Sequence, residues 1–117
     1  MQPKEKERLL KYLFDALLAA EELETYGGLN PSKFAINNVK WIAERGIEII
    51  SEALKRAQVI QPNIEISNLY KIFATRNKIA HEYDLVDPYQ LYLIVKNHIP
   101  ILIAEIKNLI EKIEADL

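Results

Sequence analysis

The sequence predicts an all-α fold, an antiparallel four-helix bundle with a kinked last helix, in a single domain over residues 1–117. Three observations favour this fold. Apolar residues recur at three- and four-residue spacing along four segments, which is the pattern of one buried helix face. There are only three glycines and five prolines, whereas sheet proteins need frequent turn residues. A chain of 117 residues that is half apolar has room for one hydrophobic core.

The first helix is expected from about Pro3 to Tyr26. Gly27-Gly28 should end it, because glycine readily adopts the left-handed conformation that closes a helix. Asn30-Pro31 then provides a cap and a first-turn proline for the second helix. Gly46 falls on the apolar stripe of that second helix. We expect its missing side chain to let a neighbouring helix approach closely.

The third helix is expected from about Asn68 to Tyr83, with Ser67 as its cap. It follows a break at Gln61-Pro62-Asn63, where the periodic pattern of the second helix stops.

Asp87-Pro88 should begin the fourth helix, which runs to about Ala115 and is kinked by Pro100. Its apolar residues lie on more than one side of the helix, which indicates burial on more than one side. We expect a second copy of the chain to provide that second cover. The apolar residues off the main stripe are Ile94, Ile101, Ile103 and Ile110.

Composition excludes several classes of protein. Cysteine is absent, so there is no disulfide framework, thiol nucleophile or thiolate metal site. His81 and His98 are far apart in the sequence and do not resemble a metal cluster, and no cofactor is indicated. No apolar run is long enough to cross a membrane, and the charged N-terminal segment lacks a signal peptide, so a cytoplasmic protein is expected. With a net charge of −2, any RNA contact must use a local basic patch.

The end of the third helix carries polar residues that amphipathic packing does not require. On an ideal helix Arg76, Asn77, Ala80 and His81 share an arc of about 140°, with small Ala80 leaving space between the guanidinium and the imidazole. That pair suits a phosphate, because arginine holds it with two parallel hydrogen bonds and histidine moves protons near neutral pH. The alternative is an ordinary solvated face, since arginine and histidine five residues apart occur by chance in many helices.

The segment resembles a known motif. Arg76, Asn77, His81 and Tyr83 match the R-x4-H-x-Y motif of HepT-like proteins in the HEPN superfamily. The resemblance covers about residues 8–113, although Ser51 stands where a glycine is common. The flanking segments that also resemble the family are 49–56, 83–87 and 98–102.

The resemblance implies a metal-independent endoribonuclease, the toxin of a toxin–antitoxin pair. In that chemistry the ribose 2′-hydroxyl attacks the adjacent phosphate. His81 would transfer protons, Arg76 would stabilise charge on the phosphoryl oxygens, and Asn77 would orient the phosphate or the histidine. Such cleavage is helped by both a base and an acid, yet the segment offers one histidine per chain. A two-fold homodimer that joins two copies would supply both, in agreement with the family's interface-built site.

The resemblance also implies a partner, a minimal nucleotidyltransferase antitoxin, and a modification site. Tyr83 matches the family tyrosine that accepts nucleotidyl groups from that partner. An adenylate there would place bulk and negative charge beside Arg76 and block the RNA phosphate. The residues alone favour an ordinary boundary tyrosine, with its ring in the core and its hydroxyl in water. Lys78 is expected to help RNA to dock.

Two other functions stay open: a non-catalytic HEPN module that scaffolds the nucleotidyltransferase or binds nucleotides, and a purely structural dimer. His98 precedes the helix kink and is expected to be structural. Glu44, Arg45 and Glu48 are expected to form a surface ion-pair row. The aromatic residues expected in the core are Tyr12, Phe14, Trp41, Tyr70 and Phe73.

Overall fold

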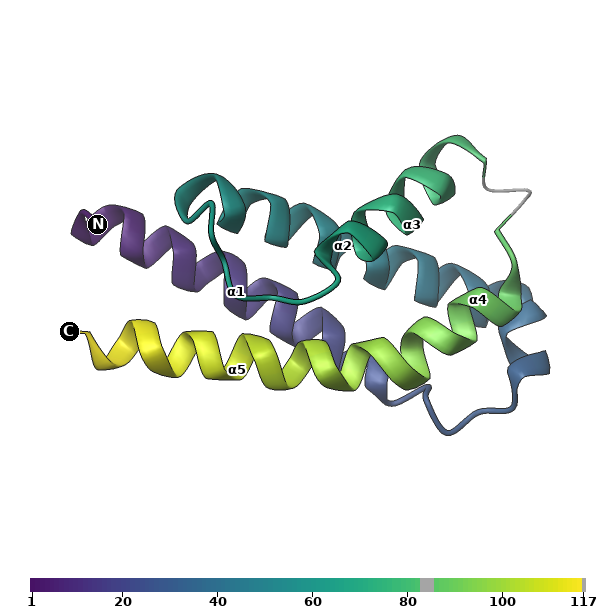
Figure 1. The fold of residues 1–117 in the computed structure, drawn as a ribbon. Helices are drawn as coiled ribbons and strands as arrows, with labels where there is room; N and C mark the ends of the chain where they lie inside the picture. Colours follow the sequence, from purple (N-terminus) through teal and green to yellow (C-terminus); the bar gives the residue numbers. More distant parts are fainter. Residues whose placement is uncertain (83–85, 117) are drawn as a thin grey trace.

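A computed structural model describes residues 1–82 and 86–116, and in this part of the chain every regular element is helical, as predicted (Figure 1). α1 and α2 are antiparallel, and α5 lies alongside α1 so that both termini reach the same end of the bundle (Figure 1). α3 packs on α2. The elements are α1 (Pro3–Glu24), the 3₁₀-helix η1 (Pro31–Ala35), α2 (Asn37–Ile60), α3 (Leu69–His81), α4 (Pro88–Leu93), the π-helix η3 (Ile94–His98) and α5 (Ile99–Ala115).

The start and end of α1 follow from local hydrogen bonds. Glu5 Oε1 accepts from the Gln2 N–H at 3.1 Å, which satisfies one donor at the helix start. The helix ends near the expected position. Gly27 and Gly28 do not adopt the left-handed conformation that was expected to end it, because neither has a positive φ. Instead, the N–H groups of Tyr26 and Gly27 bond back to Leu23 and Glu24 at 2.9 and 3.0 Å.

Two expected helix starts are wrong in detail. Asn30-Pro31 begins the short η1 rather than the second helix, and α2 begins at Asn37. Ser67 does not cap α3, because its hydroxyl and its N–H both donate to Glu105 on α5, at 2.8 and 2.9 Å. Asn68 precedes α3 instead, in the left-handed region with a φ of 59°.

The last helix begins as predicted. Asp87 caps it, with Oδ1 accepting from the Tyr89 N–H at 2.9 Å. The expected irregularity near Pro100 takes the form of the π-helical turn η3, which ends directly before α5. A proline crowds the turn that precedes it, so the wider turn lies where this crowding acts.

Gly46 confirms the prediction of a close helix approach. A Cβ built there would lie 2.7 Å from Leu23 Cγ, far inside van der Waals contact, so α1 and α2 meet at this point.

The second cover of the last helix comes from the chain itself, which corrects the expectation that another copy provides it. Ile94, Ile103 and Ile110 are all buried within the single chain. α5 packs along α1, and the segment 61–68 contacts α5 through Ser67 and Glu65. Only Ile101 of that set is exposed, at 52%.

Exposed apolar surface lies instead over α1 and α2. We call Leu18, Trp41, Ile42 and Ile49 the α1–α2 apolar face; all four are exposed and line two adjoining cavities. Trp41, together with Phe14 and Tyr70, was expected in the core, and that expectation is wrong for all three. None of the helices, as far as the structure describes them, is both long and apolar enough to span a membrane.

Candidate active site

α3 carries the motif and is held on α2 by one apolar stripe. Leu69, Ile72 and Ile79 of α3 are buried, and the Lys55 ammonium of α2 lies 5.3 Å from the centre of the Phe73 ring. Three residues of the motif, Arg76, Asn77 and His81, lie in the C-terminal half of α3, outside this apolar stripe.

Arg76 is half-buried and reaches into a cavity of about 620 Å³ between α1 and α2. The other charged groups of this cavity are paired with one another: Lys11 with Asp15 at 3.2 Å, Arg45 with Glu48 at 3.6 Å, and Arg56 with Glu52 at 3.0 Å. Arg76 forms no ion pair with any residue that the structure describes. A guanidinium can hold an anionic ligand with two parallel hydrogen bonds, and no described acid occupies this one.

His81, Asn77 and Lys78 are exposed, and none of them lines the cavity that holds Arg76. Five residues of helix turn His81 by about 140° from Arg76, so the two side chains leave different sides of α3. Exposed Ala80 lies between these sides, as expected. The structure thus keeps the motif open to solvent without bringing the guanidinium and the imidazole into one pocket of a single chain. Tyr83 lies outside the described residues.

Sequence reasoning missed a buried polar pair on α2. Ser51 is fully buried and its Oγ has no hydrogen-bond partner; Glu44 is buried with Oε2 unpartnered. Burial raises the pKa of Glu44; nearby Lys40 opposes this change and Glu48 adds to it. The expected surface ion-pair row is therefore wrong for Glu44. The Arg45–Glu48 pair is confirmed.

The same side of α2 carries Glu44, Ser51 and Lys55, of which Lys55 contacts the Phe73 ring of α3. The sequence did mark Ser51 as unusual, because it stands where a glycine is common in the family. Among residues 1–82 and 86–116, no three histidine, aspartate or glutamate side chains gather to hold a metal ion.

A family model described as "Ribonuclease HepT-like" matches residues 16–109, which includes α3 and the whole motif. The chain belongs to the HepT-like family. This confirms the resemblance on which the site residues were chosen, and it supports a ribonuclease. No curated protein and no solved structure matched the chain.

Proposed function

We propose that this HepT-like protein is a metal-independent endoribonuclease and the toxin of a toxin–antitoxin pair, and that Arg76 and His81 cleave RNA at a composite site in a homodimer. The family match over residues 16–109 carries the proposal. The geometry supports it, because Arg76 has no acidic partner in the described structure and His81 is exposed to solvent.

In the proposed reaction the imidazole of one His81 accepts the proton of the ribose 2′-hydroxyl. The 2′-oxygen then attacks the adjacent phosphorus, and the bond from phosphorus to the 5′-oxygen breaks. The second protomer's imidazole gives a proton to the leaving 5′-oxygen. Arg76 stabilises the negative charge that gathers on the phosphoryl oxygens, and Asn77 orients the phosphate or the imidazole.

The α1–α2 apolar face is the surface that we propose for dimerisation. Leu18 is 67% and Trp41 65% exposed, so this face presents two large apolar side chains to solvent. Leu18 and Ile49 also line the cavity that holds Arg76. A second copy seated on this face would bury the apolar residues and would lie beside the cavity that holds Arg76.

The proposed partner is a minimal nucleotidyltransferase, which would neutralise the toxin by attaching a nucleotide to Tyr83. Charge and bulk at that position, two residues after His81, would compete with RNA for Arg76. Intact-protein mass spectrometry after co-expression with such an enzyme tests this. An adenylate mass on wild type and none on Tyr83→Phe is expected; equal modification of both proteins would rule Tyr83 out.

The catalytic proposal is tested with purified Arg76→Ala and His81→Ala proteins on a mixed set of RNAs, with Lys107→Gln as a control of similar surface character. Each motif variant should lose at least about 100-fold in cleavage rate, the usual contribution of a general acid or base. Lys107 lies on α5 and pairs with Glu21 at 3.8 Å, away from the motif, so its variant should cleave normally. Failure of the wild type on every RNA would instead favour the non-catalytic binding module.

A further inference from the structure

A groove follows a different side of α3 from the Arg76 cavity, between α3 and the continuous run of α4, η3 and α5. It consists of two cavities of about 340 and 380 Å³. Because both are lined by Ala74, Thr75, Gln90 and Ile94, they adjoin and form one hollow along the helix. We call it the α3–α4 groove.

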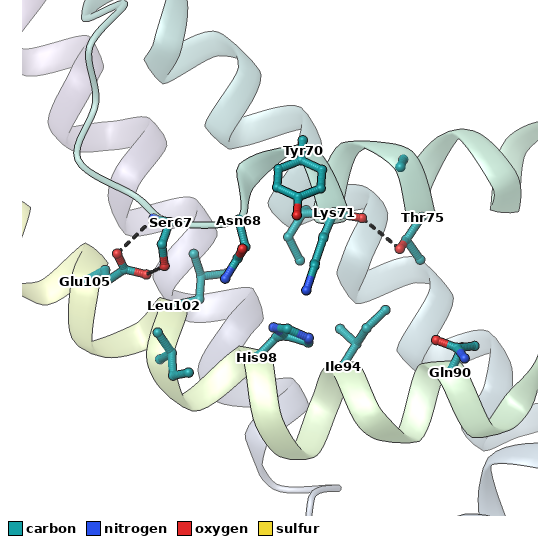
Figure 2. Close-up of a pocket in the computed structure, with 13 residues that line it drawn as sticks. Ser67, Asn68, Tyr70, Lys71, Thr75, Gln90, Ile94, His98, Leu102 and Glu105 are labelled. Atoms are coloured by element: carbon teal, nitrogen blue, oxygen red, sulfur yellow. Dashed lines mark hydrogen bonds between the residues drawn. The ribbon is translucent and has the colours of Figure 1, made fainter.

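At one end of the groove two nitrogen-bearing side chains face each other. Figure 2 shows Lys71 of α3 and His98 of η3 pointing toward one another across the cavity. Neither forms an ion pair within the described chain. The nearby acid, Glu105, is turned aside, because its two oxygens accept from Ser67 at 2.8 and 2.9 Å (Figure 2). An ammonium opposite an imidazole, with no acid between them, suits a phosphate.

The side of α3 that carries Lys71 also carries the motif histidine. Lys71, Ala74, Lys78 and His81 follow each other at spacings of three, four and three residues, so they lie on one side of α3. Lys78 lines the second cavity of the groove. At about 1.5 Å per helical residue, the path from Lys71 to His81 is about 15 Å long, the span of about four stacked nucleotides.

The groove also offers surface for bases. Buried Ile94 and Leu102 line it, and the Tyr70 ring stands at its edge with 68% of the residue exposed. Sites for single-stranded nucleic acid combine cations that follow the backbone with aromatic rings on which bases stack. Tyr70 provides the aromatic ring, and Lys71 and His98 provide the groups for the backbone phosphate, all within one cavity.

We propose that the α3–α4 groove binds the single-stranded RNA that flanks the cleaved bond, with a phosphate between Lys71 and His98 and a base against Tyr70. This deepens the proposed ribonuclease function and rests on it for the choice of RNA. It assigns His98 to substrate binding, where the sequence had suggested only a structural role at the kink.

The test measures binding without cleavage. A fluorescein-labelled hexanucleotide whose 2′-oxygens are all methylated lacks the attacking hydroxyl, so fluorescence anisotropy gives the dissociation constant directly. A protein with both Lys71→Gln and His98→Gln should bind about 10-fold more weakly, the loss expected for a charged hydrogen bond. The slope of log affinity against log salt should also fall by about 0.7 for each phosphate that the variant no longer neutralises.

Two further proteins keep the result interpretable. Lys107→Gln removes a cation from another part of α5 and should bind the oligonucleotide as the wild type does. Ala74→Glu leaves Lys71 and His98 in place but puts a carboxylate into the part of the groove that both cavities share, so it should also weaken binding. Ala74 is exposed and glutamate is a good helix former, so the fold should be kept.

The outcomes separate the groove from the catalytic proposal. Weaker binding by the groove variants together with no cleavage by the wild type would support the groove and overturn the ribonuclease. If the wild type cleaves RNA and the groove variants bind the oligonucleotide as tightly as the wild type does, the proposed RNA binding in the groove is wrong but the ribonuclease proposal stands. An equal loss of affinity in Lys107→Gln would overturn it as well, since binding would then reflect total charge. If the groove variants bind RNA normally but no longer bind a co-expressed protein, the groove serves a protein partner and the proposal is contradicted.

Discussion

Replacing Gly46 by alanine tests the contact between α1 and α2 on which the bundle and its exposed face are built. In a free helix the change is favourable by about 1 kcal/mol, because glycine is a poor helix former. Here the added Cβ would lie 2.7 to 2.8 Å from the Cγ, Cδ1 and Cδ2 atoms of Leu23, which is only 1% exposed. Overpacking of this kind costs about 1–3 kcal/mol. The net expectation is a loss of about 1 kcal/mol in the free energy of unfolding.

The sign of the effect should reverse when the clash is removed. Leu23→Ala deletes all three crowded atoms, so Gly46→Ala in that background should stabilise by about 1 kcal/mol. The free energies come from urea unfolding followed by circular dichroism. Gly28→Ala is the matched control: a Cβ there meets nothing within 4 Å, so it should be neutral or slightly stabilising. Destabilisation by Gly46→Ala of equal size in both backgrounds would refute the reasoning.

Three further predictions concern buried polar groups and the proposed interface. Ser51→Ala should raise the free energy of unfolding by about 1 kcal/mol in urea titrations, because it removes a buried hydroxyl without a partner. Glu44→Gln should stabilise at pH 7: burial raises the folded-state pKa above the ordinary 4.5, so the wild type loses stability as pH rises through the folded value. That advantage should vanish below pH 4.5, where the carboxyl is protonated even when unfolded; an advantage that persists at low pH would contradict the linkage. Leu18→Glu changes a 67% exposed position, so each chain should still fold. Sedimentation should shift from dimer to monomer, and cleavage should be lost. An active, dimeric variant would place the interface elsewhere.

Periodicity predicted the helices well, because the spacing of the apolar residues on one helix face can be read directly from the sequence. It also predicted the close approach at Gly46, where only a missing side chain fits. What it could not predict was which surface of another element covers each helix. Ile103 and Ile110 seemed to need a second copy of the chain, yet both are buried in the single chain, where α1 and the segment 61–68 contact α5. Ser67 had the right residue type for a cap, but Glu105, distant in sequence, takes both of its donors.

The candidate site shows the same division. The identity of Arg76, Asn77 and His81 came from the motif, and the family match over 16–109 confirms only the family resemblance from which they were taken. The arrangement of other residues around them could not be predicted from the motif. The cavity around Arg76, whose other charges are paired, depends on α1 and α2. His98 reaches the groove from a π-helical turn, and Pro100 predicted only that the helix is irregular near this point.

The central claim is that His81 catalyses RNA cleavage, and the rate of cleavage by purified His81→Ala protein tests it most directly. His81 is exposed, so the variant should keep the circular dichroism spectrum and melting temperature of the wild type. With a chelator present throughout, wild type and Lys107→Gln should cleave RNA, and His81→Ala should be slower by at least about 100-fold. Undiminished cleavage by the folded His81→Ala protein would contradict the account.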